Sequence, residues 1–204
     1  MSTSSFPVAH DVVRAASVLV LPLFAAHNAL WIAHGLRTGG LLYEAMSTPL
    51  GRLDAAVFGA AYVAVPLALL GLAFGLGGRQ RALGRSGVVF AAVALAGSAV
   101  GALALAASGE PPPYAFPVAT LAMFASALLV GAAHLRAGVV QRRVAVAVAL
   151  FGALTLPLGL ALPALLGGVA PEYTYFEAHF LFSGAMWSVV GLSTDRPVHA
   201  PPVG

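Results

Sequence analysis

Long apolar runs separated by short polar gaps dominate the chain. Six of these runs are long enough to cross a lipid bilayer, since each transmembrane helix needs about 20 mostly apolar residues. They cover residues 15–34, 55–77, 86–108, 114–135, 144–168 and 173–194. The last run is the weakest, because its uninterrupted apolar core extends only from Phe180 to Leu192. The pattern predicts an all-α, polytopic integral membrane bundle of six transmembrane helices.

Little of the chain lies between the runs, so residues 1–204 are expected to form a single membrane domain whose main partner is the lipid bilayer. The start of the chain has only one arginine before the first run, and the alanines after Phe24 match a cleavage site poorly. We therefore expect the first run to be a retained span rather than a signal peptide.

The polar gaps differ in charge, and this difference predicts an orientation. All ten basic residues are arginines, and a six-span threading puts eight of them on the side of the two termini. The opposite side has only Arg37 and Arg52, together with most of the acidic residues. We expect the protein to lie in the cytoplasmic membrane of a prokaryote. Because arginine-rich loops stay on the cytoplasmic side, both termini are expected in the cytoplasm. The arginines then mark topology, and no nucleic-acid partner is expected.

Composition excludes several kinds of chemistry. The chain has no cysteine, which excludes disulfides, thiolate catalysis and cysteine-ligated metals. It has no lysine either, which excludes a Schiff base of the retinal type. No zinc-protease, serine-hydrolase or phosphate-loop motif occurs. The sequence thus favours a protein that is not an enzyme.

Small residues and boundary residues suggest how the helices pack and begin. Gly71-x-x-x-Gly75, Gly97-x-x-x-Gly101 and Gly184-x-x-x-Ser188 match the pattern of closely packed membrane helices. Asp54, at the start of the second run, is expected to cap that helix. Pro171 followed by Glu172 is typical of a helix start.

An internal repeat is one further hypothesis. Phe24 and His34 in the first run have the same spacing as Phe124 and His134 in the fourth run, and an arginine follows each histidine. A three-plus-three repeat would give two oppositely oriented halves, as in many transporters. Chance similarity in a chain rich in alanine, leucine and glycine is the alternative.

Polar side chains within the apolar runs are candidate functional residues, because a polar group in hydrocarbon is costly. In the first run, His27 and His34 are two helical turns apart and share a face with Trp31, and Asn28 lies beside them. In the sixth run, Glu177 and His179 stand at the start of the helix.

Helix rise indicates the depth of these groups. His27 lies about 20 Å above Arg14, and His179 lies about 24 Å above Asp195. The two histidines would meet in the outer half of the bilayer if the first and sixth helices are neighbours. The candidate substrate- or cofactor-binding residues are therefore His27, Asn28, His34, Glu177 and His179. His134, at the cytoplasmic end of the fourth run, lies outside this group.

Several interpretations of these residues remain open. They are interfacial or helix-linking polar groups, or they line the path of a small permease or ion- or proton-coupled carrier with a small-molecule or ion substrate. A third interpretation makes His27 and His179 the axial ligands of a b-type haem in a membrane redox protein or subunit. A structural or assembly subunit of a larger membrane complex is a further alternative.

Overall fold

The computed structural model describes residues 6–76, 80–175 and 177–193. The described chain is all-α, with six helices and two short 3₁₀ turns. In chain order they are α1 (Phe6–Thr38), η1 (Leu42–Ala45), α2 (Pro49–Gly75), α3 (Arg81–Ser108), α4 (Ala115–Ala137), α5 (Arg142–Leu166), η2 (Glu172–Thr174) and α6 (His179–Ser193).

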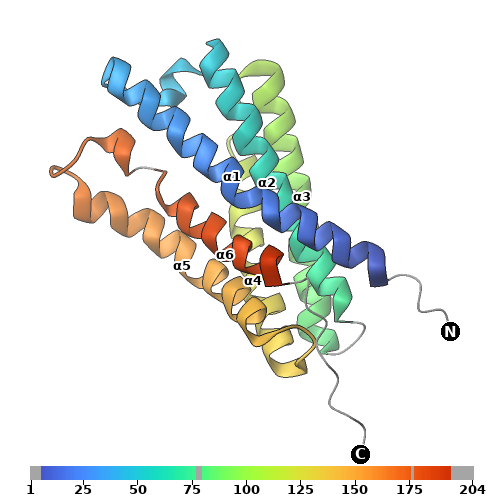
Figure 1. The fold of residues 1–204 in the computed structure, drawn as a ribbon. Helices are drawn as coiled ribbons and strands as arrows, with labels where there is room; N and C mark the ends of the chain where they lie inside the picture. Colours follow the sequence, from blue (N-terminus) through green and yellow to red (C-terminus); the bar gives the residue numbers. More distant parts are fainter. Residues whose placement is uncertain (1–5, 77–79, 176, 194–204) are drawn as a thin grey trace, which may run out of the picture.

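The six helices form a ring in which neighbours in sequence are neighbours in space. Each helix packs against the next one, and α6 returns to pack against α1, so the ring closes. Figure 1 shows α1 crossing beside α2 and α6, with η1 and η2 towards the same end of the bundle. A few contacts between α2 and α4 cross the interior of the ring. The first and sixth helices are therefore neighbours.

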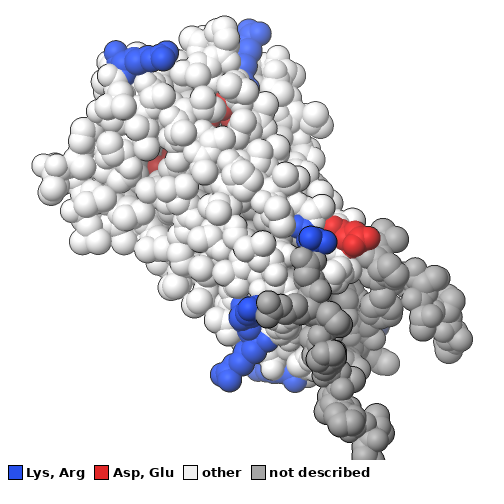
Figure 2. Space-filling model, viewed as in Figure 1, with Lys and Arg blue, Asp and Glu red and all other residues white. Residues whose placement is uncertain are grey.

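Five of the helices confirm predicted spans. Helices α1 to α5 are each long and apolar enough to cross a membrane. Many of their large apolar side chains face outward, among them Leu103 at 71 % exposure and Leu160 at 68 % exposure. In the space-filling view of Figure 2, blue arginine atoms gather at the two ends of the molecule, and a broad zone between them is largely free of charge. The protein is thus a multi-pass membrane protein.

The sixth predicted span, 173–194, differs from the structure. Residues Glu172–Thr174 form the separate turn η2, which the Thr174 hydroxyl stabilises by donating to the Pro171 carbonyl at 2.6 Å. Helix α6 begins only at His179 and has 15 residues, so it falls short of the length of a full span. Its far end lies beside the α4–α5 connection, because the Gln141 side chain donates to the Ser193 carbonyl at 3.1 Å.

The cap of α2 also differs from the prediction. The hydroxyl of Thr48 accepts a hydrogen bond from the Gly51 amide at 3.2 Å and is therefore the N-cap. The helix starts at Pro49, a residue whose fixed φ suits a first helical turn. Asp54 thus lies inside the helix and does not cap it.

Close helix packing depends on glycines that the small-residue motifs include. An added Cβ at Gly97 would lie 3.0 Å from the Ala115 carbonyl of α4, and one at Gly184 would lie 2.9 Å from the Leu21 backbone of α1. At Gly75, by contrast, an added Cβ would meet nothing within 4 Å. The motifs that begin at Gly97 and Gly184 therefore bring helices of this chain into close contact, whereas Gly75 faces open space.

Candidate functional site

A buried ion pair joins α1 to α2. The Nδ1 of His27 donates to Oδ1 of Asp54 at 2.7 Å, and the side chains are only 3 % and 1 % exposed. A carboxylate at this depth in an apolar bundle is costly unless it is paired and hydrogen-bonded. The second oxygen of Asp54 accepts from the Trp31 indole nitrogen at 3.2 Å, which satisfies the remaining side of the carboxylate.

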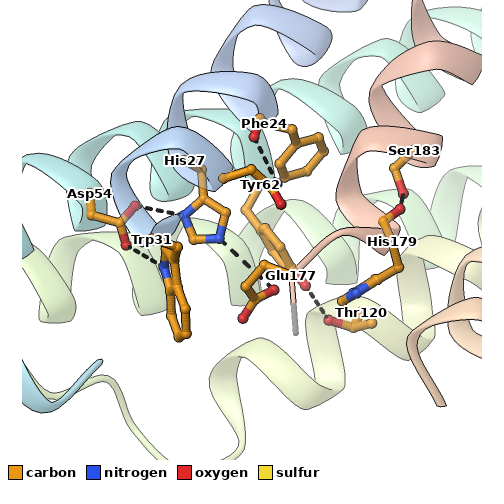
Figure 3. A network of polar contacts seen from close by, with 10 residues as sticks. Phe24, His27, Trp31, Asp54, Tyr62, Thr120, Glu177, His179 and Ser183 are labelled. Carbon is orange, nitrogen blue, oxygen red and sulfur yellow. Dashed lines mark hydrogen bonds and ion pairs between the residues drawn. The ribbon is translucent and has the colours of Figure 1, made fainter. Parts of the chain in front are cut away.

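A second carboxylate approaches the opposite side of the imidazole. Oε2 of Glu177 lies 3.9 Å from Nε2 of His27. Figure 3 marks this ion pair with a dashed line. The Glu177 side chain is 15 % exposed and is thus the most accessible member of the group. We call His27, Asp54 and Glu177 the histidine–carboxylate cluster. Side-chain exposure falls along the cluster, from 15 % at Glu177 to 3 % at His27 and 1 % at Asp54.

Aromatic rings surround the central histidine. The ring centroid of His27 lies 4.8 Å from that of Phe58, 5.8 Å from that of Trp31 and 5.9 Å from that of Phe180. The Trp31 and Phe180 rings stand at steep angles to the imidazole, 60° and 74°, and the Phe58 ring is tilted by 39°. Trp31 thereby contributes both a hydrogen bond to Asp54 and an aromatic surface to His27.

The cluster lies near the end of the bundle where η1 and η2 are found. Asp54 is in the second turn of α2, about 8 Å along the helix from Pro49. The connection that supplies Glu177 is held close to α1, since the Tyr173 ring of η2 lies directly against the backbone of Gly35. Only a glycine leaves room for this ring.

Of the five site residues predicted from the sequence, the structure brings two, His27 and Glu177, into contact. Asn28 donates instead to the Phe24 carbonyl of its own helix at 2.9 Å. His179 stands at the start of α6, with its ring against that of Phe180 at 4.1 Å and close to Gly159 of α5. His34 is half-buried near the end of α1, and no contact between it and the cluster is found in the described part of the chain.

His134 lies apart from the cluster, against Leu72 of α2. It is buried in the last turn of α4, where its Nε2 donates to the Leu72 carbonyl of α2 at 2.9 Å. This bond joins two helices that are not neighbours in the ring. Whether His134 and His34 belong to an internal repeat stays a prediction.

Asp54 is the residue that sequence reasoning missed. Its position at the edge of an apolar run suggested a cap, and that interpretation is wrong. One signal was available, because Thr48-Pro49 already provides a complete helix start six residues earlier. An acid six residues after such a start lies within the helix, and a buried one needs a partner.

The geometry does not fit an axial haem pair. Each axial histidine needs a nitrogen directed at an iron between the two rings. Both nitrogens of His27 face carboxylates, and the Phe180 ring packs against both His27 and His179. Nor does any group of three metal-binding side chains close enough to hold a metal ion occur within the described residues.

Together, the ring of apolar helices and the interior cluster define a helical multi-pass membrane protein with a buried titratable site. No protein-family model, no curated protein and no solved structure matches the chain.

Proposed function

We propose that the protein is a small proton-translocating membrane carrier, coupled to a small-molecule or ion substrate, and that the histidine–carboxylate cluster is its proton-binding site. The observation that supports this proposal most strongly is the position of His27, between the sealed Asp54 at 2.7 Å and the partly accessible Glu177 at 3.9 Å. Titratable groups are rare within membrane helices because they are costly, and they commonly mark ion or proton pathways.

The cluster is suited to exchanging one proton at a time. With His27 protonated and both carboxylates ionised, its net charge is −1, and one further proton makes it neutral. Both states keep a charge-assisted hydrogen bond between His27 and Asp54. Glu177 is the group through which the proton enters, because it is the most exposed of the three.

The proposal includes an orientation. The cluster lies at the end of the bundle that carries Arg37 and Arg52, and the other arginines among the described residues lie towards the opposite end. By the positive-inside bias, the cluster faces outward and both termini are cytoplasmic. Helix α6 crosses the membrane core despite its length of about 22 Å, since its end meets Gln141 at the α4–α5 connection.

Proton flux into proteoliposomes tests the proposal. Purified protein is reconstituted with a pH-sensitive dye inside the vesicles, and an inward proton gradient and a negative interior potential are imposed. We expect the protein to conduct protons without its substrate, faster than empty vesicles leak them, and we expect this flux to be lost in His27→Ala and Asp54→Asn. Asp11→Asn is the matched control, because the Asp11 side chain is 83 % exposed near the start of α1. Flux that is equal in wild type, His27→Ala and empty vesicles contradicts the proposal.

A further inference from the structure

A groove lies on the outer face of the ring, between α1 and α3. Residues 12–19 of α1 and 99–103 of α3 form its walls, and residues 59–67 of α2 form its floor. Its volume is about 690 Å³, and sites for small molecules typically have roughly 300–1,000 Å³. Figure 1 shows α1 crossing α2 and α3 obliquely, an arrangement that leaves this space beside α2. We call it the α1–α3 groove.

Side-chain size gives the groove its shape. Ala64 is buried in the floor, and an added Cβ at Gly59 would lie 2.8 Å from Cβ of Ala102, so α2 and α3 are in close contact there. Leu19 and Leu103 are 53 % and 71 % exposed and raise the two walls. All residues that line the groove are glycine, alanine, valine or leucine. The groove therefore presents a hydrocarbon surface that suits an apolar chain.

An exposed basic residue lies on the groove face of α3. Arg85 precedes Ala99 by two heptads, so the two residues share a helix face, and between them Val89 is 61 % exposed. Helix rise separates Arg85 from Ala99 by about 21 Å. A bilayer about 40–45 Å thick places the headgroups of one leaflet about 20 Å from its centre. A phospholipid whose phosphate lies at Arg85 thus reaches the groove with the ends of its acyl chains.

Charge favours an anionic lipid over a second copy of the chain as the occupant. At the arginine-rich end of the bundle, where α1 and α3 begin, the exposed residues Arg14 and Arg85 outnumber Asp11. Net positive charge near the membrane surface attracts anionic headgroups. A two-fold dimer across the groove would instead place Arg85 of both copies at the same depth, where like charges repel each other.

We propose that the α1–α3 groove binds an acyl chain of an anionic phospholipid from the leaflet at the arginine-rich end, and that Arg85 binds the phosphate of this lipid. The bound chain fills the space between α1 and α3 and contacts all three helices. The site is separate from the histidine–carboxylate cluster and does not depend on the proposed function.

Native mass spectrometry of the purified protein tests the headgroup site. The protein is titrated in detergent with phosphatidylglycerol, which is anionic, and with phosphatidylcholine of the same chain length. We expect tighter binding of phosphatidylglycerol. Arg85→Gln should weaken that binding about fivefold, the effect of one basic residue near an anionic headgroup, and should leave phosphatidylcholine unchanged. Arg143→Gln is the matched control, because Arg143 is exposed at the start of α5, which does not line the groove.

Two substitutions that fill the groove test the acyl-chain site. Ala60→Leu and Ala15→Leu add bulk at exposed alanines of α2 and α1 that line the groove, and both should weaken the binding of either lipid. Ala153→Leu adds the same bulk at an exposed position of α5 and should have no effect. Thermal unfolding in detergent shows which variants are folded, and because the two groove variants alter different helices, a folding defect in one leaves the other as the test.

Three results would overturn the proposal. Equal affinities of the wild type for the two lipids, or unchanged binding in Arg85→Gln, would remove Arg85 as the phosphate site. Lipid binding unchanged in both groove variants would remove the groove. A wild-type dimer that Ala60→Leu converts to a monomer would show that a second copy covers the groove. Lipid binding is measured without a proton gradient, so its failure and a failure of the proton flux are independent results.

Discussion

Asp54 holds the imidazole of His27 across the α1–α2 interface, with 2.7 Å between Oδ1 and Nδ1 and with both side chains almost completely buried. The same carboxylate accepts from Trp31 one helical turn further along α1. One acidic side chain thus fixes two residues on a single face of the neighbouring helix. The pair is a structural link between two helices as well as the centre of the proposed proton site.

The first prediction concerns the stability of this link. Asp54→Ala leaves the His27 and Trp31 donors buried without their acceptor, and breaking a buried pair in this way costs about 3–5 kcal/mol. Asp54→Asn keeps an acceptor oxygen and should cost less. Thermal unfolding in detergent, followed by circular dichroism, measures both variants. Asp11→Ala is the exposed control, and an Asp54→Ala variant as stable as this control would show that the pair contributes nothing to folding.

Hydrophobic pattern was sufficient to predict α1 to α5, because a bilayer imposes a minimum length on every apolar helix. The depth of His27 along the first helix, counted from Arg14, predicted a place in the outer half of the bilayer, and that placement stays a prediction. The α6 prediction was too long because it counted the aromatic residues Tyr173 and Tyr175 as part of the span. Residues Glu172–Thr174 instead form a short turn after Pro171, which the Thr174 hydroxyl stabilises.

The pairing of side chains could not be predicted with the same success. Helical periodicity shows which residues share a face, but not which neighbouring helix that face meets. Asn28 illustrates the difference, since it is buried beside His27 yet bonds to its own helix at Phe24. His27 and Asp54 belong to different runs, and only the packing of α1 against α2 brings them together.

The second prediction tests how the outer connection positions Glu177. An added methyl group at Gly35 collides with the Tyr173 ring, so Gly35→Ala should push η2 away from α1 and move Glu177 away from His27. We expect reduced proton flux while the Asp54–His27 pair stays intact. Gly75→Ala is the matched control, because a Cβ at Gly75 meets no atom within 4 Å. Equal flux in the two variants would mean that the Tyr173 contact does not position Glu177.

The third prediction concerns closure of the ring between α1 and α6. A side chain at Gly184 would overlap the Leu21 backbone, and one at Gly191 would lie 3.0 Å from the Val18 amide nitrogen. Gly184→Leu should therefore separate the two helices and cost about 1–3 kcal/mol, as overpacking does elsewhere. Gly75→Leu adds the same side chain in open space and should be neutral. Unfolding midpoints in detergent compare the two, and equal values would contradict the close α1–α6 packing.

The last prediction tests orientation, and the absence of native cysteine makes the experiment direct. Ser108 and Thr174 are exposed at the end of α3 and in η2, whereas Arg142 is exposed at the start of α5. If the cluster faces outward, single cysteines at 108 and 174 react with a membrane-impermeant maleimide on intact cells, and a cysteine at 142 reacts only after permeabilisation. The opposite pattern would reverse the orientation. Labelling of 142 and 174 from the same side would show that α5 does not cross, because α5 separates the two positions.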